Sequence, residues 1–467
     1  MLPPGPSSHP AVQAFRYLRE PFAFLDDCAK RFGDKFTVRV PRRPPLVFIN
    51  EPDAIKEIFA APTDVVLTGE ANASVGFTFG RHSLILLDGK RHERERRLLM
   101  PPFHGERMAT YLEQIVHITE RAMGPIRPGD TFSIRATMET ITLDVILECV
   151  FGIGPGPRQE RFRDLLRTFI KEGKTTPAYM HVLGMLFRDR AAFREFLATK
   201  VAPMTDVLPS VLRFLPTASV ARCIRDLDRL LFDDIAVRRA KVTKGGVDVM
   251  SMLLAARYED GRGLGDEELR DEMMTMLIAG HDTTATTLAF AVSKLLESPH
   301  VLEQVRDELA RVVGARALTP ELLRELKYLD ATVKEVLRLY DPAPGFARVL
   351  AKPLRVGGYD LPAGVMVTTS TYLLHRDPRF WTNPHGFDPS RFLDRRVRPT
   401  QYVPFGGGSR TCLGMAFALY ETKVVLAHLI HRTRLRAIPG PPLNLAIAGL
   451  IYGPSHDVPV ILERRAA

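Results

Sequence analysis

The sequence predicts a mainly α-helical protein with small β-sheets, an α+β fold built around one long central helix. Apolar residues recur at helical spacing over most of the chain from Asp53 to Lys352. Within this region, residues 266–297 form the longest helical run, which is apolar nearly all round, as is typical of a buried helix. Short β-like pieces flank the helical region on both sides. We find no internal repeat or low-complexity linker, so we expect a single domain over residues 1–467.

Individual elements follow from local signals. Alternating apolar and β-branched residues predict strands, which are expected at residues 36–40, 46–49, 354–356, 366–370 and 458–462. The glycine-rich segment 69–80 is expected to be a loop with little regular structure. Pro320 after Thr319 predicts a helix start, because proline at the first helical position has no N–H to satisfy. A proline-rich segment, residues 1–20, comes before the first strand.

Composition is that of a globular protein with a large core, since 45% of the 467 residues are hydrophobic and 25% are charged. No stretch approaches the ~20 apolar residues that span a bilayer, and the N-terminus lacks the pattern of a signal peptide. We therefore expect no membrane anchor in residues 1–20. The four cysteines have no paired spacing, so we expect no disulfides and a cytoplasmic location. The net charge of +10 is spread along the chain without a nucleic-acid motif, which favours an acidic protein partner.

Residues 405–414 carry the most specific chemical signal, a glycine-rich loop with Cys412 just before an apolar helical run at residues 415–429. Glycines allow backbone N–H groups to approach the sulfur, and a helix N-terminus favours the thiolate. A thiolate without a second cysteine nearby makes a poor zinc site but a good axial ligand for haem iron. Because most single buried cysteines are inert core residues, the spacing of the whole loop decides between the two interpretations.

This loop resembles the haem-ligand loop of cytochromes P-450, whose pattern is F-x-x-G-x-R-x-C-x-G. The fixed positions all match, at Phe405, Gly408, Arg410, Cys412 and Gly414. The resemblance implies the cytochrome P-450 fold, a helical domain around a buried haem b, with Cys412 as the axial iron ligand, Gly414 in the haem-binding loop and O2 as the co-substrate. Phe405 would shield the sulfur, and Arg410 would pair with a haem propionate.

A polar motif, residues 279–284, interrupts the apolar middle of the long helix. Buried polar groups without partners are costly, and threonine side chains can loosen the backbone ladder, with Gly280 favouring a local opening. A polar stripe facing solvent is the alternative, which the apolar flanking residues disfavour. The motif resembles the family's oxygen-activation sequence A/G-G-x-D/E-T. The resemblance implies that Ala279 lies against the haem, that Thr283 hydrogen-bonds the iron-bound dioxygen, and that Asp282 relays protons.

Glu335 and Arg338 have E-x-x-R spacing, which makes them neighbours on a helix. Most such pairs are surface salt bridges of little energetic weight. Residues 387–392, however, resemble the family segment F-x-P-x-R-F. The resemblance implies a buried structural triad of Glu335, Arg338 and Arg391 near the proximal face of the haem, where loss of one member would leave an unpaired charge.

Residues 89–97 are dense in charge, and a solvated helix face is the ordinary interpretation. The family usually has W-x-x-x-R here, whereas this chain has His92 in place of tryptophan, followed by Arg96. The resemblance implies that His92, Arg96 and Arg348 hydrogen-bond the haem propionates. The other basic residues of the segment are expected to form a docking surface for an acidic ferredoxin or flavodoxin: Lys90, Arg91, Arg94 and Arg97.

Substrate contacts inferred from the family pattern are mostly apolar, which implies a hydrophobic small molecule such as a fatty acid, terpene, steroid or polyketide. An apolar stripe is, by itself, more often plain core than pocket. Besides helices between about Phe169 and Leu215, the expected contacts are Phe77, Phe79, Met276, Ala343, Phe346 and Ile451.

The expected activity is that of a soluble, bacterial-type, monomeric haem–thiolate monooxygenase of secondary metabolism. The chain carries no flavin or iron–sulfur motif, so two electrons should come from separate proteins, a reductase with a ferredoxin or flavodoxin. Three alternatives remain. A peroxygenase or isomerase would tend to lose the Asp282–Thr283 pair, a haem sensor or carrier would leave that pair unexplained, and a non-haem helical protein would require four motif coincidences.

Overall fold

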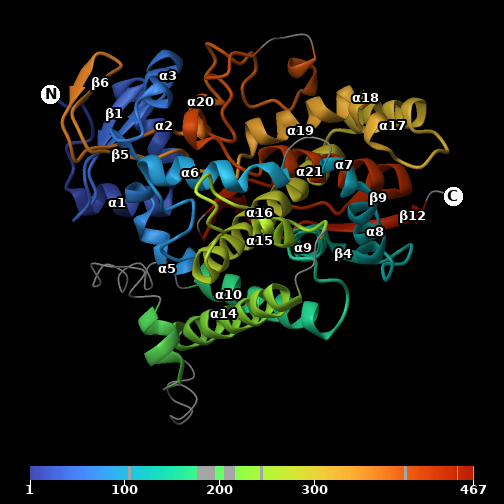
Figure 1. The fold of residues 1–467 in the computed structure, drawn as a ribbon. Helices are drawn as coiled ribbons and strands as arrows, with labels where there is room; N and C mark the ends of the chain where they lie inside the picture. The colour runs from blue at the N-terminus through green and yellow to red at the C-terminus, as the bar shows by residue number, and fades with distance from the viewer. Residues whose placement is uncertain are drawn as a thin grey trace.

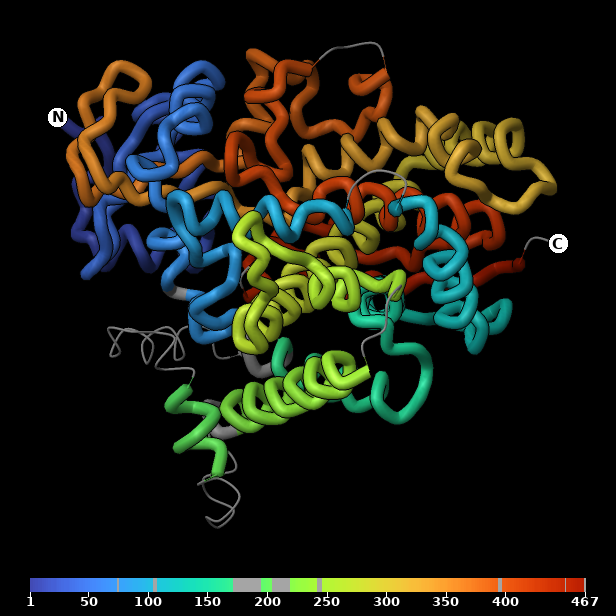
Figure 2. Tube along the Cα trace, in the orientation of Figure 1, coloured from blue at the N-terminus to red at the C-terminus, as the bar shows by residue number. Residues whose placement is uncertain are grey.

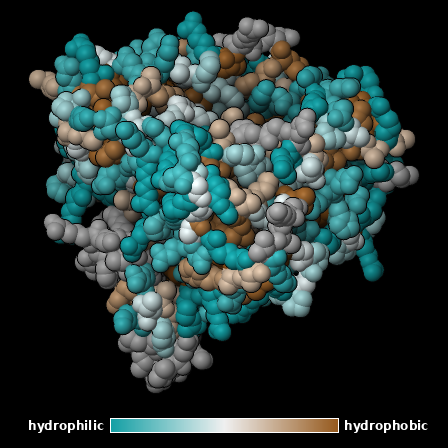
Figure 3. Space-filling model, viewed as in Figure 1, coloured by the Kyte–Doolittle hydropathy of each residue, from teal (hydrophilic) through white to brown (hydrophobic). Residues whose placement is uncertain are grey.

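The computed structural model describes residues 1–103, 107–175, 195–203, 216–241, 246–393, 397–449 and 451–465. Helices dominate these residues, and the strands form four small sheets, as the sequence predicts. The strands β1, β5 and β6 lie on the left of Figure 1, β4, β9 and β12 lie on the right, and helices fill the centre. The two termini lie on opposite sides (Figure 2), and the face seen in Figure 3 is mainly hydrophilic with small apolar groups.

The longer helices are α1 Pro10–Arg19, α2 Pro21–Phe32, α3 Pro52–Ala60, α6 Gly89–Leu99, α8 Leu112–Met123, α9 Ile134–Val145, α10 Pro157–Thr175, α14 Pro216–Lys241, α16 Asp266–Glu297, α17 Pro299–Val312, α19 Lys327–Leu339 and α21 Met415–Arg432. Shorter ones are α4 Thr68–Ala71, α5 Gly76–Phe79, α7 Arg107–Thr110, α15 Val249–Ala255, α18 Pro320–Glu325 and α20 Thr371–Leu374. Single turns and π-helical segments are η1 Ala73–Val75, η2 Pro101–Phe103, η3 Ile146–Val150, η4 Leu197–Val201, η6 Pro389–Phe392 and η7 Gly408–Arg410.

The largest sheet has the strand order β1-β2-β8-β5-β3. This sheet joins strands that are distant in sequence. Strand β2 pairs with β8 in parallel, and the other neighbouring strands of the sheet pair antiparallel. Its five strands are β1 Lys35–Val38, β2 Leu46–Ile49, β3 Val66–Leu67, β5 Arg348–Leu350 and β8 Met366–Thr368. The smaller sheets contain β4 Thr131–Ser133 with β12 Pro459–Arg465 and β9 Thr433–Ala437, β6 Leu354–Val356 with β7 Tyr359–Leu361, and β10 Leu445–Ala448 with β11 Ile451–Pro454.

Helix α16 runs through the middle of the molecule and packs against α9, α14, α19 and α21 (Figure 1). Its first turn holds three acidic residues, which suit the positive end of the helix dipole, and Glu268 Oε2 accepts a hydrogen bond from Gly265 N at 2.8 Å. Its bounds confirm the sequence prediction. The expected opening at Gly280 is wrong, since α16 is continuous there. A Cβ at Gly280 would lie 2.8 Å from Ile146 Cδ1, so this glycine permits close helix packing.

The segment 69–80 also differs from its prediction, because it holds the short helices α4 and α5 rather than a plain loop. Asp88 caps α4 from a distance of some twenty residues along the chain. Its two carboxylate oxygens accept hydrogen bonds from Gly69 N at 2.8 Å and Glu70 N at 3.0 Å. Local sequence signals miss a helix whose cap comes from such a distant residue. Thr319, in contrast, caps α18 as predicted.

All four cysteines are free thiols, in agreement with the expected absence of disulfides. Among the residues that the structure describes, none of the helices combines the length and apolar character that a membrane span requires.

Candidate active site

A cavity of about 410 Å³ lies between α16, α6, the segment that joins α19 to β5, and the loop that carries Cys412. It brings together most of the residues that the sequence singles out. The predicted residues that line it are His92, Arg96, Met276, Ala279, Thr283, Ala343, Phe346, Arg348, Phe405, Arg410, Cys412 and Gly414.

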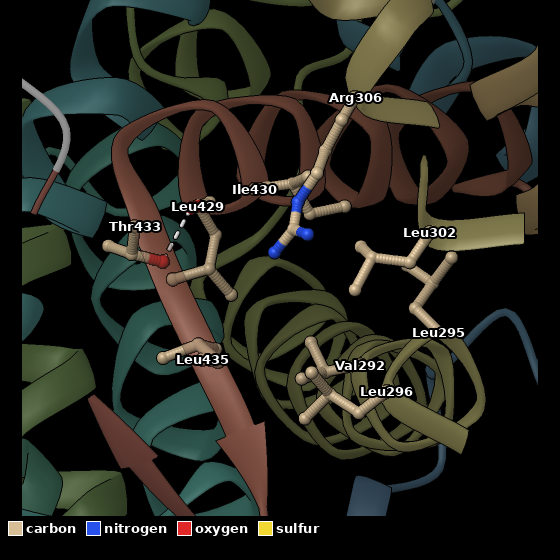
Figure 4. A pocket seen from close by; sticks show the side chains of 9 residues that line it. All are labelled: Val292, Leu295, Leu296, Leu302, Arg306, Leu429, Ile430, Thr433 and Leu435. Atoms are coloured by element: carbon tan, nitrogen blue, oxygen red, sulfur yellow. Dashed lines mark hydrogen bonds between the residues drawn. The ribbon is translucent and has the colours of Figure 1, made fainter. Parts of the chain in front are cut away.

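A separate apolar pocket of about 20 Å³ lies between the C-terminal parts of α16 and α21. Figure 4 shows the guanidinium group of Arg306 pointing into it between aliphatic side chains. It has room for little more than one water-sized molecule, and its walls carry no nucleophile or carboxyl group. Most of the predicted site residues line the larger cavity, and none of them lines this pocket.

Cys412 is surrounded by protein, but its thiol is open to the cavity. The loop before it is fixed by backbone hydrogen bonds, including Cys412 N to Phe405 O at 2.9 Å. Gly408 has a φ of +65°, and a Cβ there would lie 2.2 Å from the carbonyl oxygen of Phe59, so this position requires glycine. The ring of Phe59 on α3 lies against the preceding glycine, since a Cβ at Gly407 would lie 2.2 Å from Phe59 Cδ2.

The pKa of the Cys412 thiol depends on its burial and on the groups close to the sulfur. Burial raises the pKa of the thiol, whereas a hydrogen bond from the backbone N–H of Gly414 and the charge of Arg96 lower it by less. The expected thiolate bias from the helix N-terminus therefore does not prevail in the protein alone, because desolvation is the larger effect. A metal cation at the sulfur is the kind of group that would reverse this balance.

Four basic side chains converge at one edge of the cavity: His92, Arg96, Arg348 and Arg410. His92 is 2% exposed, its Nδ1 has no hydrogen-bond partner among the described residues, and its pKa falls to about 3 through burial and the three arginines. Burial and Arg410 lower the pKa of Arg348 to about 10. A neutral, unsatisfied histidine among three arginines fits a ligand with more than one carboxylate, as haem has.

Asp88 provides a counter-charge for this basic cluster, and the sequence analysis did not anticipate it. Arg410 Nη2 lies 2.6 Å from Asp88 Oδ1, and Arg410 also donates to the carbonyl oxygens of Leu84 and Leu87. Burial lowers the pKa of Arg410 to about 10, although Asp88 acts in the opposite direction. One carboxylate among these cations leaves an excess of positive charge at the edge of the cavity.

The polar motif of α16 faces the cavity in part. Thr283 lines the cavity, and its hydroxyl donates to the carbonyl oxygen of Ala279 at 2.8 Å. Thr284 makes the same i−4 bond to Gly280 at 2.9 Å. Asp282 is half-buried and is not among the residues that line the cavity. The structure therefore places Thr283, but not Asp282, among the residues that line the cavity.

The Glu335, Arg338 and Arg391 side chains are in contact. Arg338 Nε and Nη2 lie 2.7 Å and 2.8 Å from the two oxygens of Glu335, and Arg391 Nε lies 3.2 Å from Glu335 Oε1. Glu335 and Arg338 are both fully buried. Arg338 also donates to the carbonyl oxygens of His375 and Pro384, each at 2.7 Å. These bonds attach α19 to the segment that leads into the Cys412 loop.

Three expected substrate contacts, Phe77, Phe79 and Ile451, are not among the residues that line this cavity. Phe79 is buried on α5, Phe77 packs against the main core, and Ile451 is a half-buried residue of β11. Most of the segment from Phe169 to Leu215 lies outside the described residues. Lining residues that the sequence analysis missed include Thr68, Leu84, Ile85, Glu272, Thr275 and Asp341.

For one of these residues, Glu272, the sequence contains a signal that predicts its place at the cavity. Glu272 lies about three helical turns before Thr283, and this spacing places both on one face of α16. Asp341 follows the end of α19, where no local pattern indicates a cavity.

The basic residues of α6 are less available than the sequence suggests. Arg94 is ion-paired with Asp260, Arg97 with Glu259, and Arg91 contacts His82. The acidic loop between α15 and α16 thus folds over this helix and offsets part of its charge. Neighbours in space, not in sequence, supply these carboxylates.

Comparison with known proteins agrees with this geometry. The family model for cytochrome P450 matches residues 3–447. A putative cytochrome P450 135B1 of Mycobacterium tuberculosis is 35% identical over 436 residues, covering 93% of this chain and 85% of the relative. The cyclooctat-9-en-7-ol 5-monooxygenase of Streptomyces melanosporofaciens is 32% identical, covering 78% of this chain and 74% of the relative.

Solved structures share the fold. A retinoic acid-bound cyanobacterial CYP120A1 superposes with a TM-score of 0.82 at 24% identity, covering 100% of this chain and 99% of the other. The haem domain of cytochrome P450DA superposes with a TM-score of 0.83, covering 100% and 98% of the two chains. These matches confirm the fold class that the sequence predicts. The chain belongs to the cytochrome P450 family of haem-dependent monooxygenases.

Proposed function

We propose that this enzyme binds haem b in the cavity of about 410 Å³, with Cys412 as the axial iron ligand. It inserts one oxygen atom of O2 into a hydrophobic organic substrate, and the other atom leaves as water. The observation that supports the proposal is the Cys412 thiol, open to a cavity whose edge carries the cluster of His92, Arg96, Arg348 and Arg410. A haem bound here supplies the activation of O2, which protein side chains alone do not provide.

The surroundings of Cys412 favour binding of a metal cation by its thiolate. The backbone N–H of Gly414 and the charge of Arg96 both favour the thiolate, and a metal cation would add the attraction that overcomes burial. Phe405 lines the same cavity as Cys412 and is proposed to shield the sulfur from water.

The basic cluster orients the cofactor through its two carboxylates. Arg96, Arg348 and Arg410 offer charged donors, and His92 offers a buried ring nitrogen whose hydrogen bond is unmade in the protein alone. A bound carboxylate would stabilise protonated His92 and raise its pKa from the low value that burial and the arginines impose. The cluster therefore contributes both orientation and binding energy.

Thr283 and Asp282 are proposed to deliver protons. The Thr283 hydroxyl can exchange its bond to the Ala279 carbonyl for a bond into the cavity, because the two geometries differ only in the side-chain torsion. Asp282, the next residue behind it, is the proposed source of the proton. The presence of this pair favours a monooxygenase over a peroxygenase or isomerase.

The substrate is proposed to be a hydrophobic small molecule of the fatty acid, terpene, steroid or polyketide classes. The walls formed by Met276, Ala343 and Phe346 are apolar. The relative from Streptomyces acts, by its name, on cyclooctat-9-en-7-ol, which supports the terpene class. Electrons are proposed to come from a separate ferredoxin or flavodoxin with its reductase, docking near the basic residues of α6.

The carbon monoxide difference spectrum of the dithionite-reduced protein tests this function. A red-shifted Soret band, typical of thiolate ligation, is expected, and Cys412→Ala should abolish it while the fold is retained. A band at the position of histidine-ligated haem, or a thiolate band that survives in the variant, would overturn the ligand assignment. Turnover supported by peroxide but not by reduced ferredoxin would favour a peroxygenase.

A further inference from the structure

Two buried carboxyl groups face the same cavity from different elements. Glu272, on α16, is 1% exposed, and Asp341, just after α19, is 5% exposed. Both line the cavity. Within the described part of the chain, Glu272 Oε1 has no hydrogen-bond partner. Asp341 Oδ2 has none with hydrogen-bond geometry, although the hydroxyl of Thr371 lies close enough to lower the pKa of Asp341. Buried polar atoms without partners are rare, so both oxygens point to a ligand that completes them.

Asp341 is held firmly in the cavity wall. Its Oδ1 accepts a hydrogen bond from Ala343 N at 2.9 Å, and Thr371 Oγ1 donates to Ala343 O at 2.8 Å. Tyr452 N donates to Pro342 O at 2.8 Å, so successive peptide groups of this wall are tied in place. Burial raises the pKa of Asp341 well above its usual range. Burial therefore favours the neutral form of the carboxyl group, which can both donate and accept a hydrogen bond.

Glu272 lines the cavity from α16, as Asp341 does from the segment after α19. The backbone N–H of Leu84 is a hydrogen-bond donor to its carboxyl group, and burial, followed by the nearby charge of Glu95, raises its pKa well above the usual range. Burial thus favours the neutral form of the Glu272 carboxyl group as well. Thr275, one turn further along the same wall, already uses its hydroxyl in bonds to Ser83 and Asp271.

The distribution of charge restricts what these groups recognise. Among the described residues that line the cavity, the basic ones are His92, Arg96, Arg348 and Arg410, and all four belong to the cluster proposed to hold the haem carboxylates. A substrate carboxylate would therefore meet two acidic groups without a cation of its own, which is unfavourable in a buried site. A plain hydrocarbon would leave both carboxyl groups unsatisfied.

We propose that the substrate is a neutral, mainly apolar molecule that carries a hydroxyl or carbonyl group, which hydrogen-bonds to Glu272 or Asp341, and that free fatty acids are excluded. This inference rests on the proposed function, because it assigns the basic cluster to the cofactor. It narrows the substrate classes to oxygenated, uncharged members.

A series of ligands with one chain length and different head groups tests the proposal. Dodecane, 1-dodecanol, 2-dodecanone, dodecanoate and dodecylamine are titrated into the holoenzyme, and binding is followed by the Soret spin-state shift and by the rise in Tm. The alcohol and the ketone are expected to bind about 2- to 12-fold more tightly than dodecane, the range of one net hydrogen bond. Tightest binding of dodecanoate or dodecylamine, or equal binding of alcohol and alkane, would overturn the proposal.

Variants locate the contact. Glu272→Leu or Asp341→Ala should remove the preference for the alcohol over the alkane, whereas Glu272→Gln and Asp341→Asn should keep it. Glu421→Leu is the matched control, because Glu421 is also buried and unsatisfied among the described residues but does not line the cavity. A preference that survives both apolar variants, or is lost in the control, would contradict the assignment. If an apolar variant does not fold, the wild-type series decides the question.

The two proposals fail separately. Failure of the proposed function would appear as an absent thiolate band with carbon monoxide. Failure of the substrate inference would appear in the head-group order while that band is intact. The Tm measurement reads ligand binding even where the haem spectrum is lost.

Discussion

Arg410 and Asp88 form an ion pair, with 2.6 Å between Arg410 Nη2 and Asp88 Oδ1, that joins the Cys412 loop to the start of α6. The same carboxylate caps α4 through Gly69 N and Glu70 N. Asp88 therefore stabilises three segments that meet at the cavity edge.

We expect Asp88→Ala to destabilise the protein by about 3 kcal/mol, since it removes a helix cap and leaves the largely buried Arg410 without its counter-charge. The free energy of unfolding from urea titration measures this. Asp88→Asn, which keeps an acceptor for the α4 amides, should lose less. Equal losses in the two variants would show that the charge, not the cap, dominates.

The buried triad can be compared with an exposed pair of identical spacing. Arg338→Ala should cost about 3–5 kcal/mol, because it leaves the buried Glu335 carboxylate unpaired. Arg324→Ala removes the partner of Glu321 from another E-x-x-R pair, whose side chains are 73% and 70% exposed, and should cost well under about 1 kcal/mol.

Urea titrations of the two variants measure this contrast. Similar losses would mean that the E-x-x-R spacing, rather than burial, sets the stability. Preserved stability in Arg338→Ala would contradict the structural role of the triad.

His375 predicts a dependence of stability on pH. It is fully buried, its Nε2 accepts a hydrogen bond from Val403 N at 3.0 Å, and burial, Arg338 and Arg376 lower its pKa to about 3. Between pH about 6.5 and 3 the unfolded chain binds a proton that the folded protein does not, so stability falls as the pH falls. The loss approaches about 1.4 kcal/mol per pH unit for one such group.

His375→Gln keeps an acceptor for Val403 N but does not titrate, so its unfolding free energy should fall less steeply between pH 7 and pH 5. The exposed His300→Gln serves as the control and should keep the wild-type slope. A variant slope equal to that of the wild type would mean that His375 is already charged in the fold.

Thr283→Ala tests proton delivery. Because Thr283 presents its hydroxyl at the cavity wall, its loss should divert reducing equivalents to hydrogen peroxide and lower product per electron pair several-fold. Thr286→Ala on the same helix does not change the cavity lining and should keep normal coupling. Peroxide and product are measured together against the reductant consumed. Unchanged coupling in Thr283→Ala would assign the role to another group.

The sequence by itself determined the fold class, the bounds of α16, the positions of five of the twelve described strands and the loop of Cys412. These features are local: an apolar helical run, alternating strands, and the fixed residues from Phe405 to Gly414 are readable without knowledge of distant contacts. The prediction of α18 from Thr319 and Pro320 succeeded for the same reason, because the cap lies next to the helix that it starts.

Only the tertiary structure decided what surrounds these elements. Asp88 reaches α4 and Arg410 from different parts of the chain, Asp260 and Glu259 cover the basic residues of α6, and Ile146 explains Gly280. The cavity lining was likewise beyond local patterns. Phe79 and Met276 are both apolar, but only the packing places one in the core and the other at the cavity. Burial and charge depend on neighbours in space, and these neighbours come from segments that the sequence keeps far apart.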